Sequence, residues 1–463
     1  MVFSSISFLF FFLPVTMVLY YIAPRKWQNI LLCVNGLLFY AWGEPVFVLF
    51  MILCILLNFG AGLLMEKFDG DDKKRKAVMI ASVVFSLGLL GVCKYSGFVA
   101  DTVGLSIKTL PLPIGISFYT FQSMSYTIDL YRRNIKVQKS VFNFGAYVAM
   151  FPQIIAGPIV RYADVEKELE NREVTLSGIG AGAGIFICGL AKKSILANSI
   201  GQLWTAVKAT EFSELSVLGA WIGILAFTFQ IYFDFSGYSD MAVGLGRMLG
   251  FHFPENFRYP YTARSVSDFW RRWHMTLGTW FREYVYIPLG GNRVSTIKNI
   301  RNLLVVWGLT GLWHGASWNF ILWGLYFGIL QILEKFCFKK LLERLPAWLT
   351  TATTFLLVVF SWVLFDIEAI SDVGRFFGVM FGTTGVLYND IAVYQLINYA
   401  VVFVVCILAS LQIAPTVRGY CTAKKERAKL YYSVLPVAQL ALFLLCVAFL
   451  VNETYNPFLY FRF

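Results

Sequence analysis

Charged residues are scarce in this chain. Asp, Glu, Lys and Arg together make up 14% of its 463 residues, while hydrophobic residues make up 58%. An average soluble protein carries about 25% charged residues. Together with a mean hydropathy of +0.65, this deficit argues against a soluble globular domain. It predicts an all-α polytopic integral membrane protein.

We expect no cleavable signal peptide, and closely spaced cysteine pairs are absent from the sequence. The first apolar stretch, residues 6–23, lacks a preceding basic region and a small-residue cleavage site, so we expect it to be the first span. The eight cysteines include no Cys-x-x-Cys pair. Most of them lie in apolar segments, where we expect small core hydrophobes and neither a disulfide framework nor a metal site: Cys33, Cys54, Cys188, Cys406 and Cys446.

Acidic residues are fewer than basic ones, 27 against 39, which gives a net charge of +12. In a membrane protein, basic residues in short cytoplasmic loops are the common cause of such an excess. We therefore expect membrane lipids, and not nucleic acid, as partners. The basic clusters expected on the cytoplasmic side are 25–26, 73–76, 132–139, 258–301, 335–344 and 418–429. The mainly acidic stretch 366–390 is expected outside.

Apolar runs of spanning length alternate consistently between these loops. They are 6–23, 29–65 as a hairpin turning at 43–45, a run from 78 onward, 349–365, 396–413 and 434–451. This order predicts that both termini are extracytoplasmic. Two glycine-rich segments, 142–159 and 179–200, are where we expect broken or re-entrant helices.

Histidine occurs only three times in the sequence. One of the three, His314, lies in the stretch 302–333, which contains no Asp, Glu, Lys or Arg. An ionisable group at hydrocarbon depth indicates a functional site, and imidazole exchanges protons near pH 7. The alternative is a structural histidine hydrogen-bonded across helices. Because only 33 residues separate the basic flanks Arg301 and Lys335, we expect a helical pair that dips partway into the membrane. A break near Gly308, Gly311 or Gly315 would place His314 at the floor of a cavity.

Aromatic and charged residues interleave at 267–274 and 280–284. Helical spacing places Trp270, Trp273 and Leu277 on one face, with Arg271 and Arg282 elsewhere. One interpretation is an interfacial amphipathic helix. The other is that arginines meet an anionic donor at a cavity mouth. The remaining histidines, His252 and His274, are too few to indicate metal binding.

Four blocks of sequence closely resemble the membrane-bound O-acyltransferases: 259–261, 268–274, 280–293 and 311–315. Within that superfamily they look like the bacterial branch that contains alginate and peptidoglycan O-acetyltransferases and the teichoic-acid D-alanyl transferase. Residues 113–118, 151–158 and 233–240 support the resemblance. It implies one integral-membrane domain over 1–463 in the bacterial cytoplasmic membrane, with a core block at 250–335 and a tail at 452–463. It also implies a ring of transmembrane helices around a thin central floor with re-entrant helices.

The resemblance assigns roles to individual residues. His314 matches the catalytic histidine, and His274 occupies a second polar position where eukaryotic relatives usually carry Asn. Phe458–Phe463 resembles a C-terminal motif, F-x-Y-x-x-F, in which Tyr460 would carry the acyl group. An interfacial aromatic belt is the alternative for this tail. The residues expected to contact the substrate or donor are Asp268, Trp270, Arg271, Arg272, Trp273, Arg282 and Trp313.

The implied activity is transfer of an acetyl group from a cytosolic thioester, expected to be acetyl-CoA, for O-acetylation of an extracellular polysaccharide. No bound cofactor is expected. His314, whose apolar setting disfavours imidazolium, would act as general base. Tyr460 would relay the acetyl group to an extracytoplasmic partner with a serine nucleophile. The alternatives are D-alanyl transfer from a carrier protein to teichoic acid, and a non-enzymatic polysaccharide transporter.

Overall fold

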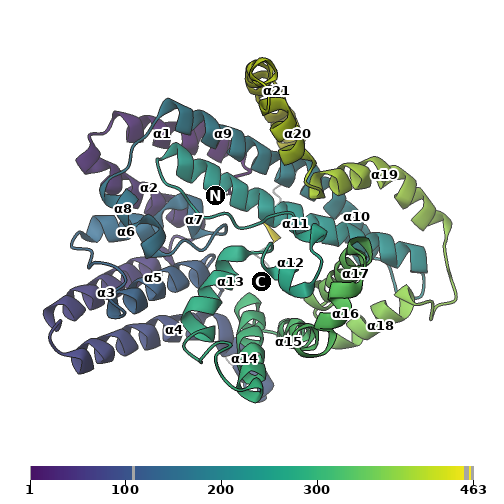
Figure 1. Ribbon diagram of the computed structural model, residues 1–463, viewed down its shortest axis with the longest axis horizontal. Coiled ribbons are helices and arrows are strands. Elements are labelled where there is room, and N and C mark those ends of the chain that lie inside the picture. The colour runs from purple at the N-terminus through teal and green to yellow at the C-terminus, as the bar shows by residue number, and fades with distance from the viewer. Residues whose placement is uncertain (1, 107–109, 453–457, 460–463) are drawn as a thin grey trace. The chain divides into compact units, whose positions relative to one another are not determined.

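The computed structural model describes residues 2–106, 110–452 and 458–459, and within these ranges it contains helices and no β-strand (Figure 1). Eight of the described helices are long and apolar enough to cross a membrane. The prediction of an all-α polytopic membrane protein is thus confirmed. These eight helices are Val48–Lys67, Asp72–Thr102, Leu176–Lys208, Val217–Met248, Trp318–Arg344, Ala347–Asp366, Asp390–Ser410 and Lys425–Asn452.

The chain divides into two compact units. Unit 1 comprises Met1–Phe186 and Tyr238–Glu255, and unit 2 comprises Ile187–Gly237 and Asn256–Phe463. Helices α9 (Leu176–Ala191) and α11 (Val217–Met248) each contribute residues to both units.

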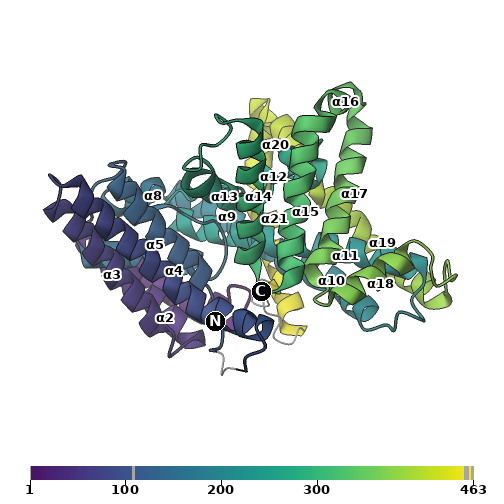
Figure 2. The same cartoon turned by 90° about the horizontal axis from the view of Figure 1, so that it is seen from below.

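Unit 1 begins with a π-helical turn, η1, that leads into α1, and its helices α3, α4 and α5 lie side by side (Figure 2). The hairpin between α2 and α3 turns at Glu44–Phe47, which confirms the expected turn at 43–45. The segment 142–159 is broken as predicted, because α6 ends at Ala149 and only one helical turn follows before irregular backbone. The elements are η1 (Phe8–Phe12), α1 (Leu13–Ile22), α2 (Arg25–Gly43), α3 (Val48–Lys67), α4 (Asp72–Thr102), α5 (Ile116–Tyr131), α6 (Val141–Ala149), α7 (Phe151–Ile154) and α8 (Tyr162–Glu170).

The second glycine-rich segment differs from its prediction. Residues 176–208 form one continuous helical run, with a π-helical stretch at Lys192–Ala197 but no break. A Cβ added to Gly182 would lie 2.5 Å from the carbonyl oxygen of Gly244, and one added to Gly237 would lie 2.7 Å from that of Gly189. These glycines therefore let α9 and α11 approach closely. The expected break at 179–200 was wrong because the glycines serve packing.

Unit 2 is built around three helices that run side by side, α14, α15 and α17 (Figure 2). The elements are η2 (Lys192–Ala197), α10 (Asn198–Lys208), η3 (Pro260–Thr262), α12 (Val266–Trp270), α13 (Met275–Phe281), η4 (Arg282–Tyr286), α14 (Thr296–His314), α15 (Trp318–Leu333), η5 (Glu334–Phe338), α16 (Lys339–Arg344), α17 (Ala347–Asp366), α18 (Ile370–Met380), α19 (Asp390–Ser410), α20 (Ile413–Thr422) and α21 (Lys425–Asn452).

The helical pair predicted around His314 is present as α14 and α15, and its break lies at Gly315–Ser317. Glycines bring the two backbones together, since a Cβ on Gly311 would collide with the carbonyl oxygen of Phe320, and one on Gly324 with that of Trp307. The second arm is longer than expected. Helical backbone continues past Lys335 to Arg344, so the basic cluster 335–344 lies within the helical run and does not end it.

The cysteine prediction is confirmed at four of its five positions. Cys33, Cys54, Cys406 and Cys446 are buried, but Cys188 is exposed. On α9 the buried residues Phe186 and Leu190 face the interior. Cys188 is therefore on the opposite side of the helix, because two residues correspond to about 200° of rotation at 3.6 residues per turn.

Candidate active site

His314 is the last residue of α14, because Gly315 leaves the helix with extended backbone. Only 4% of His314 is exposed. Its ring meets the edge or face of three aromatic rings, with centroid distances of 4.9 Å to Trp323, 5.4 Å to Phe365 and 5.0 Å to Trp313. The imidazole is therefore enclosed by apolar surface, as predicted from its sequence context.

A cavity in unit 2 opens beside His314. Its walls are almost entirely apolar, and His314 and Asp234 are the two lining residues with ionisable side chains. The carboxylate of Asp234 is paired with Lys193, so the imidazole is the lining group suited to proton exchange near pH 7. The cavity is lined by Ile231, Asp234, Phe235, Trp273, His314, Trp323, Trp362, Phe365, Phe458 and Leu459.

His274 lies in the left-handed backbone region, with φ 44°, immediately before α13. Asn256 fixes its ring. Asn256 Oδ1 accepts hydrogen bonds from the backbone N–H and the hydroxyl of Thr276 and lies 3.0 Å from His274 Nδ1. A backbone N–H can only donate, so this Asn256 atom is an oxygen and cannot donate in return. His274 Nδ1 therefore carries the proton, and Nε2 carries the lone pair.

Burial lowers the pKa of His274 to about 3, because an imidazolium would lose its hydration there. His274 is therefore neutral at physiological pH. Its Nε2 is buried and has no hydrogen-bond partner among the described residues. A buried lone pair of this kind can accept a hydrogen bond from a substrate hydroxyl.

Trp313 connects the two histidines. Its ring centroid lies 5.8 Å from that of His274 and 5.0 Å from that of His314. Trp313 itself is 3% exposed. The structure thus brings His314, His274 and Trp313 together in unit 2, three of the residues selected from the sequence.

The pattern that placed Trp270, Trp273 and Leu277 on one helix face was misleading. Helix α12 ends at Trp270 and α13 begins at Met275, with His274 in a left-handed conformation between them. The single interfacial amphipathic helix is therefore wrong. Trp273 and Leu277 are buried, and Trp273 packs 5.0 Å from Trp362 in the interior of the unit.

Three further members of the expected donor contact set serve the local fold. Asp268 accepts the backbone N–H of Arg264 and pairs with Arg272, with 3.0 Å between Oδ1 and Nε. Trp270 packs against Trp307 with ring centroids 4.6 Å apart. Asp268, Trp270 and Arg272 thus hold α12 against its neighbours.

The remaining arginines lie on the surface of unit 2. Arg282 pairs with the adjacent Glu283, with 2.7 Å between Nη2 and Oε1. Arg271 is exposed, and no carboxylate partner for it occurs among the described residues. Arg271 is therefore the arginine of the set that is most available to an anionic ligand.

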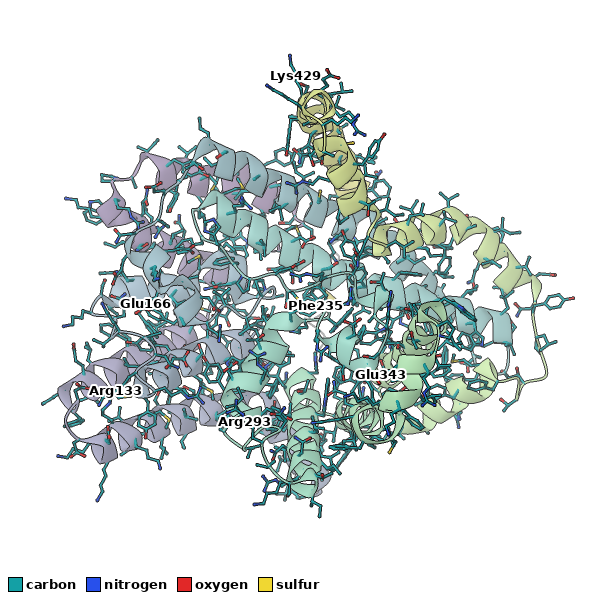
Figure 3. All side chains as sticks on the ribbon, viewed as in Figure 1. Arg133, Glu166, Phe235, Arg293, Glu343 and Lys429 are labelled. Carbon is teal, nitrogen blue, oxygen red and sulfur yellow. The ribbon has the colours of Figure 1, made fainter. Side chains whose placement is uncertain are left out.

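Tyr460 lies outside the described residues, so its role as acyl carrier stays a prediction, and the described part of the tail is Phe458 and Leu459. Phe458 and Leu459 are 2% and 9% exposed, and both line the cavity beside His314. Phe458 packs against Phe235 of α11, which is labelled in Figure 3, with ring centroids 5.6 Å apart. These two tail residues therefore lie at the histidine-lined cavity.

Sequence reasoning missed four residues of this site. Asn256 orients His274, Asp234 contacts the tail, and Trp323 and Trp362 form cavity walls. Asp234 and its partner Lys193 carried a signal, because each is an ionisable residue within an apolar run. Asn256 lies in a loop and carried none.

His252 belongs to unit 1, whereas His274 and His314 belong to unit 2. The His252 side chain is 70% exposed, and its Nδ1 lies 2.7 Å from Glu168 Oε1. The expectation that it is structural agrees with this surface pair.

Comparisons with known proteins agree with the pattern of residues. A sequence model of the membrane-bound O-acyltransferase family matches residues 34–365, which include both buried histidines. The protein named "probable alginate O-acetylase" in Pseudomonas syringae pv. tomato is 38% identical over 91% of this chain and 81% of its own length. The peptidoglycan O-acetyltransferase of Helicobacter pylori is 33% identical, over 83% and 81%. The teichoic acid D-alanyltransferase of Bacillus subtilis is 28% identical, over 54% and 67%.

Proposed function

We propose, because the chain belongs to the membrane-bound O-acyltransferase family, that it transfers acetyl groups across the membrane for O-acetylation of an extracellular polysaccharide. The observation that carries the proposal is the shared cavity. His314 lines it together with Phe458 and Leu459 of the C-terminal tail. A general base and the tail expected to accept the acetyl group thus meet at one place.

Family membership makes the chain an acyltransferase, so the alternative of a non-enzymatic transporter is wrong. Acetyl is favoured over D-alanyl because the relatives named for O-acetylation match a larger share of the chain at higher identity. An apolar cavity also suits acetyl, because the ammonium group of D-alanine would be desolvated there without a free carboxylate.

His314 acts as general base on the acceptor hydroxyl. Its imidazole takes the proton as the hydroxyl oxygen attacks the acetyl carbonyl carbon. The carbon–sulfur bond of the donor thioester then breaks, and the departing thiolate takes the proton back from the imidazolium. The base is thereby regenerated, and the products are an acetyl ester and a free thiol.

Tyr460 is the proposed first acceptor. A phenol with a pKa of about 10 is a better leaving group than an alkyl alcohol, so an acetylated tyrosine can pass its acetyl group to a serine or sugar hydroxyl. In this proposal, an extracytoplasmic partner with a serine nucleophile receives it. Only the acetyl group crosses the membrane, and the charged donor stays in the cytosol.

Acetyl-CoA is the proposed donor, because it is the cytosolic acetyl thioester and carries phosphates that arginine forks bind well. Arg271 is the first candidate for this contact, since Arg272 and Arg282 already have carboxylate partners. The site lies in the bacterial cytoplasmic membrane, with the donor entering from the cytosolic side.

Replacing His314 with Ala tests the proposal. Loss of a general base lowers rates by about 100- to 10,000-fold, so ester content of the extracellular polymer should fall to background while protein level is maintained. His252→Ala is the matched control, because it removes an exposed histidine of unit 1, and it should acetylate normally. Normal ester content in His314→Ala cells would refute the catalytic assignment.

A further inference from the structure

A buried ion pair lies beside the cavity. Lys193 of η2 and Asp234 of α11 pair through Nζ and Oδ1, and their side chains are 4% and 2% exposed. Both belong to helices that are apolar enough to cross a membrane. Burying two charges is costly and often contributes little net stability, so such a pair at membrane depth is a sign of function.

The second oxygen of this carboxylate binds the C-terminal tail. Asp234 Oδ2 accepts the backbone N–H of Leu459 at 2.9 Å, across 225 residues of sequence. Hydrogen bonds to an ionised acceptor are stronger than neutral ones. Because the donor is a main-chain group, the bond fixes the path of the tail independently of the side chain at position 459.

Side-chain packing reinforces this contact. Phe458 lies against Phe235, and Phe235 in turn packs edge-on against His274 with ring centroids 4.7 Å apart. Asp234, Phe458 and Leu459 line the same cavity as His314. The anchored amide therefore belongs to the residue next to Tyr460 and lies at the proposed catalytic base.

We infer that Asp234, oriented by Lys193, is a positioning residue that docks the C-terminal tail for acetyl transfer. Lys193 occupies one carboxylate oxygen and leaves the other aimed at the Leu459 amide. This inference rests on the proposed function, because it gives the docked tail the role of acceptor. It assigns a purpose to an ion pair that the chemistry at His314 does not otherwise use.

Two double variants isolate the anchoring hydrogen bond. Lys193→Met with Asp234→Asn and Lys193→Met with Asp234→Leu both remove the two buried charges, so neither leaves one charge unpaired. Asn and Leu have similar size and shape, but only Asn keeps an oxygen that can accept the Leu459 N–H. Any difference between the two variants therefore reports the acceptor.

Hydrogen–deuterium exchange of the C-terminal peptide measures docking directly. The Leu459 amide should be protected in the wild type and in the Asn variant, and should exchange roughly tenfold faster or more in the Leu variant, because a buried N–H is left unsatisfied. Lys208→Met is the control, since Lys208 pairs with another buried aspartate, Asp366. It should leave the Leu459 amide protected.

Polymer ester content, measured on the same variants, separates the inference from the proposed function. Loss of both protection and esters in the Leu variant, with esters largely retained in the Asn variant, supports positioning. Equal exchange in the two variants overturns the anchor, whatever the ester content. Lost protection with unchanged esters overturns the positioning role. His314→Ala should keep the amide protected, so normal esters in that variant would defeat the proposed function while leaving the anchor intact.

Discussion

His274 is held in a left-handed backbone conformation with its Nδ1–H directed to Asn256. Non-glycine residues rarely adopt this conformation, and they cluster at functional sites. Its neutral ring presents Nε2 as an acceptor beside Trp313, which also packs against His314. We expect His274 to orient an acceptor hydroxyl while His314 removes its proton.

The burial of His274 predicts a pH dependence of stability. The pKa is lowered to about 3 in the folded protein, against about 6.5 when unfolded. Between these values the unfolded state binds the proton preferentially, so the free energy of unfolding falls as pH decreases below about 6.5. The loss from this group should be on the order of 1 kcal/mol at pH 5.5, and thermal unfolding in detergent at pH 7.5 and 5.5 measures it.

His274→Asn is the control for this prediction. Asn tolerates the left-handed region, and its amide nitrogen can still donate to Asn256, but it does not titrate. The variant should therefore lose less stability than the wild type between the two pH values. The same pH-dependent loss in both proteins would contradict the assignment.

For single residues, the sequence identifies those whose type is unusual for their surroundings. His314 was found because it is the one histidine in a long uncharged stretch. Asn256 and Leu459 are not identifiable in this way, because their roles arise from contacts made on folding. The side-chain oxygen of Asn256 contacts His274, 18 residues away in sequence, and the amide of Leu459 contacts Asp234, 225 residues away.

The α14–α15 hairpin places His314 by close helix contact. Gly311 lies against the backbone of Phe320, and Gly324 lies against that of Trp307. Small residues at such a crossing permit backbone approach in helices that pack without much hydrophobic driving force. The close contact that positions the end of α14 and His314 therefore depends on glycine, which has no side chain, at positions 311 and 324.

Gly311→Ala should destabilise the protein, because the new methyl group meets a backbone carbonyl that cannot rotate away. Overpacking of this kind costs about 1–3 kcal/mol. Gly308→Ala, three residues earlier in the same helix, meets nothing within 4 Å and should stabilise by up to about 1 kcal/mol through helix propensity. Unfolding temperatures of the two variants in detergent test the hairpin, and equal values would contradict the close contact.

Element boundaries were predictable at some glycines and less so elsewhere. The break after His314 occurs at Gly315, one of three glycines considered. The break between α12 and α13 was missed because the aromatic spacing continues through it and no glycine or proline marks residues 271–274. At 179–200 the opposite error arose, since glycines that pack helices together resemble glycines that interrupt them.

Hydropathy and charge account for the membrane character of the whole molecule. Eight described helices are able to span, and family membership follows from motifs spread over most of the chain. The ring of helices around a thin floor and the single domain over 1–463 remain predictions from family resemblance. Division into units depends on contacts between distant segments, which periodicity does not encode.

Cysteine labelling tests the predicted orientation. A cysteine in place of Lys74 or Lys425 should react from the cytoplasmic side, and one in place of Asp372 from outside, because basic loops remain in the cytoplasm. The basic stretch 418–429 ends at Lys429, labelled on α21 in Figure 3. Exposed or partly exposed Cys188, Cys337 and Cys421 must first be replaced. Reactivity of all three introduced cysteines from one side would contradict the arrangement.

Mass spectrometry of the C-terminal peptide tests most directly the claim that His314 transfers acetyl to the tail. Wild-type protein purified from acetylating cells should carry an acetyl ester on Tyr460, and Tyr460→Phe should lack both this ester and polymer acetylation. The phenylalanine keeps the ring and removes only the hydroxyl. We predict that the ester is absent from His314→Ala. Two results would contradict the claim. One is an unmodified Tyr460 in the wild type together with a fully active Tyr460→Phe enzyme, and the other is as much Tyr460 ester in His314→Ala as in the wild type.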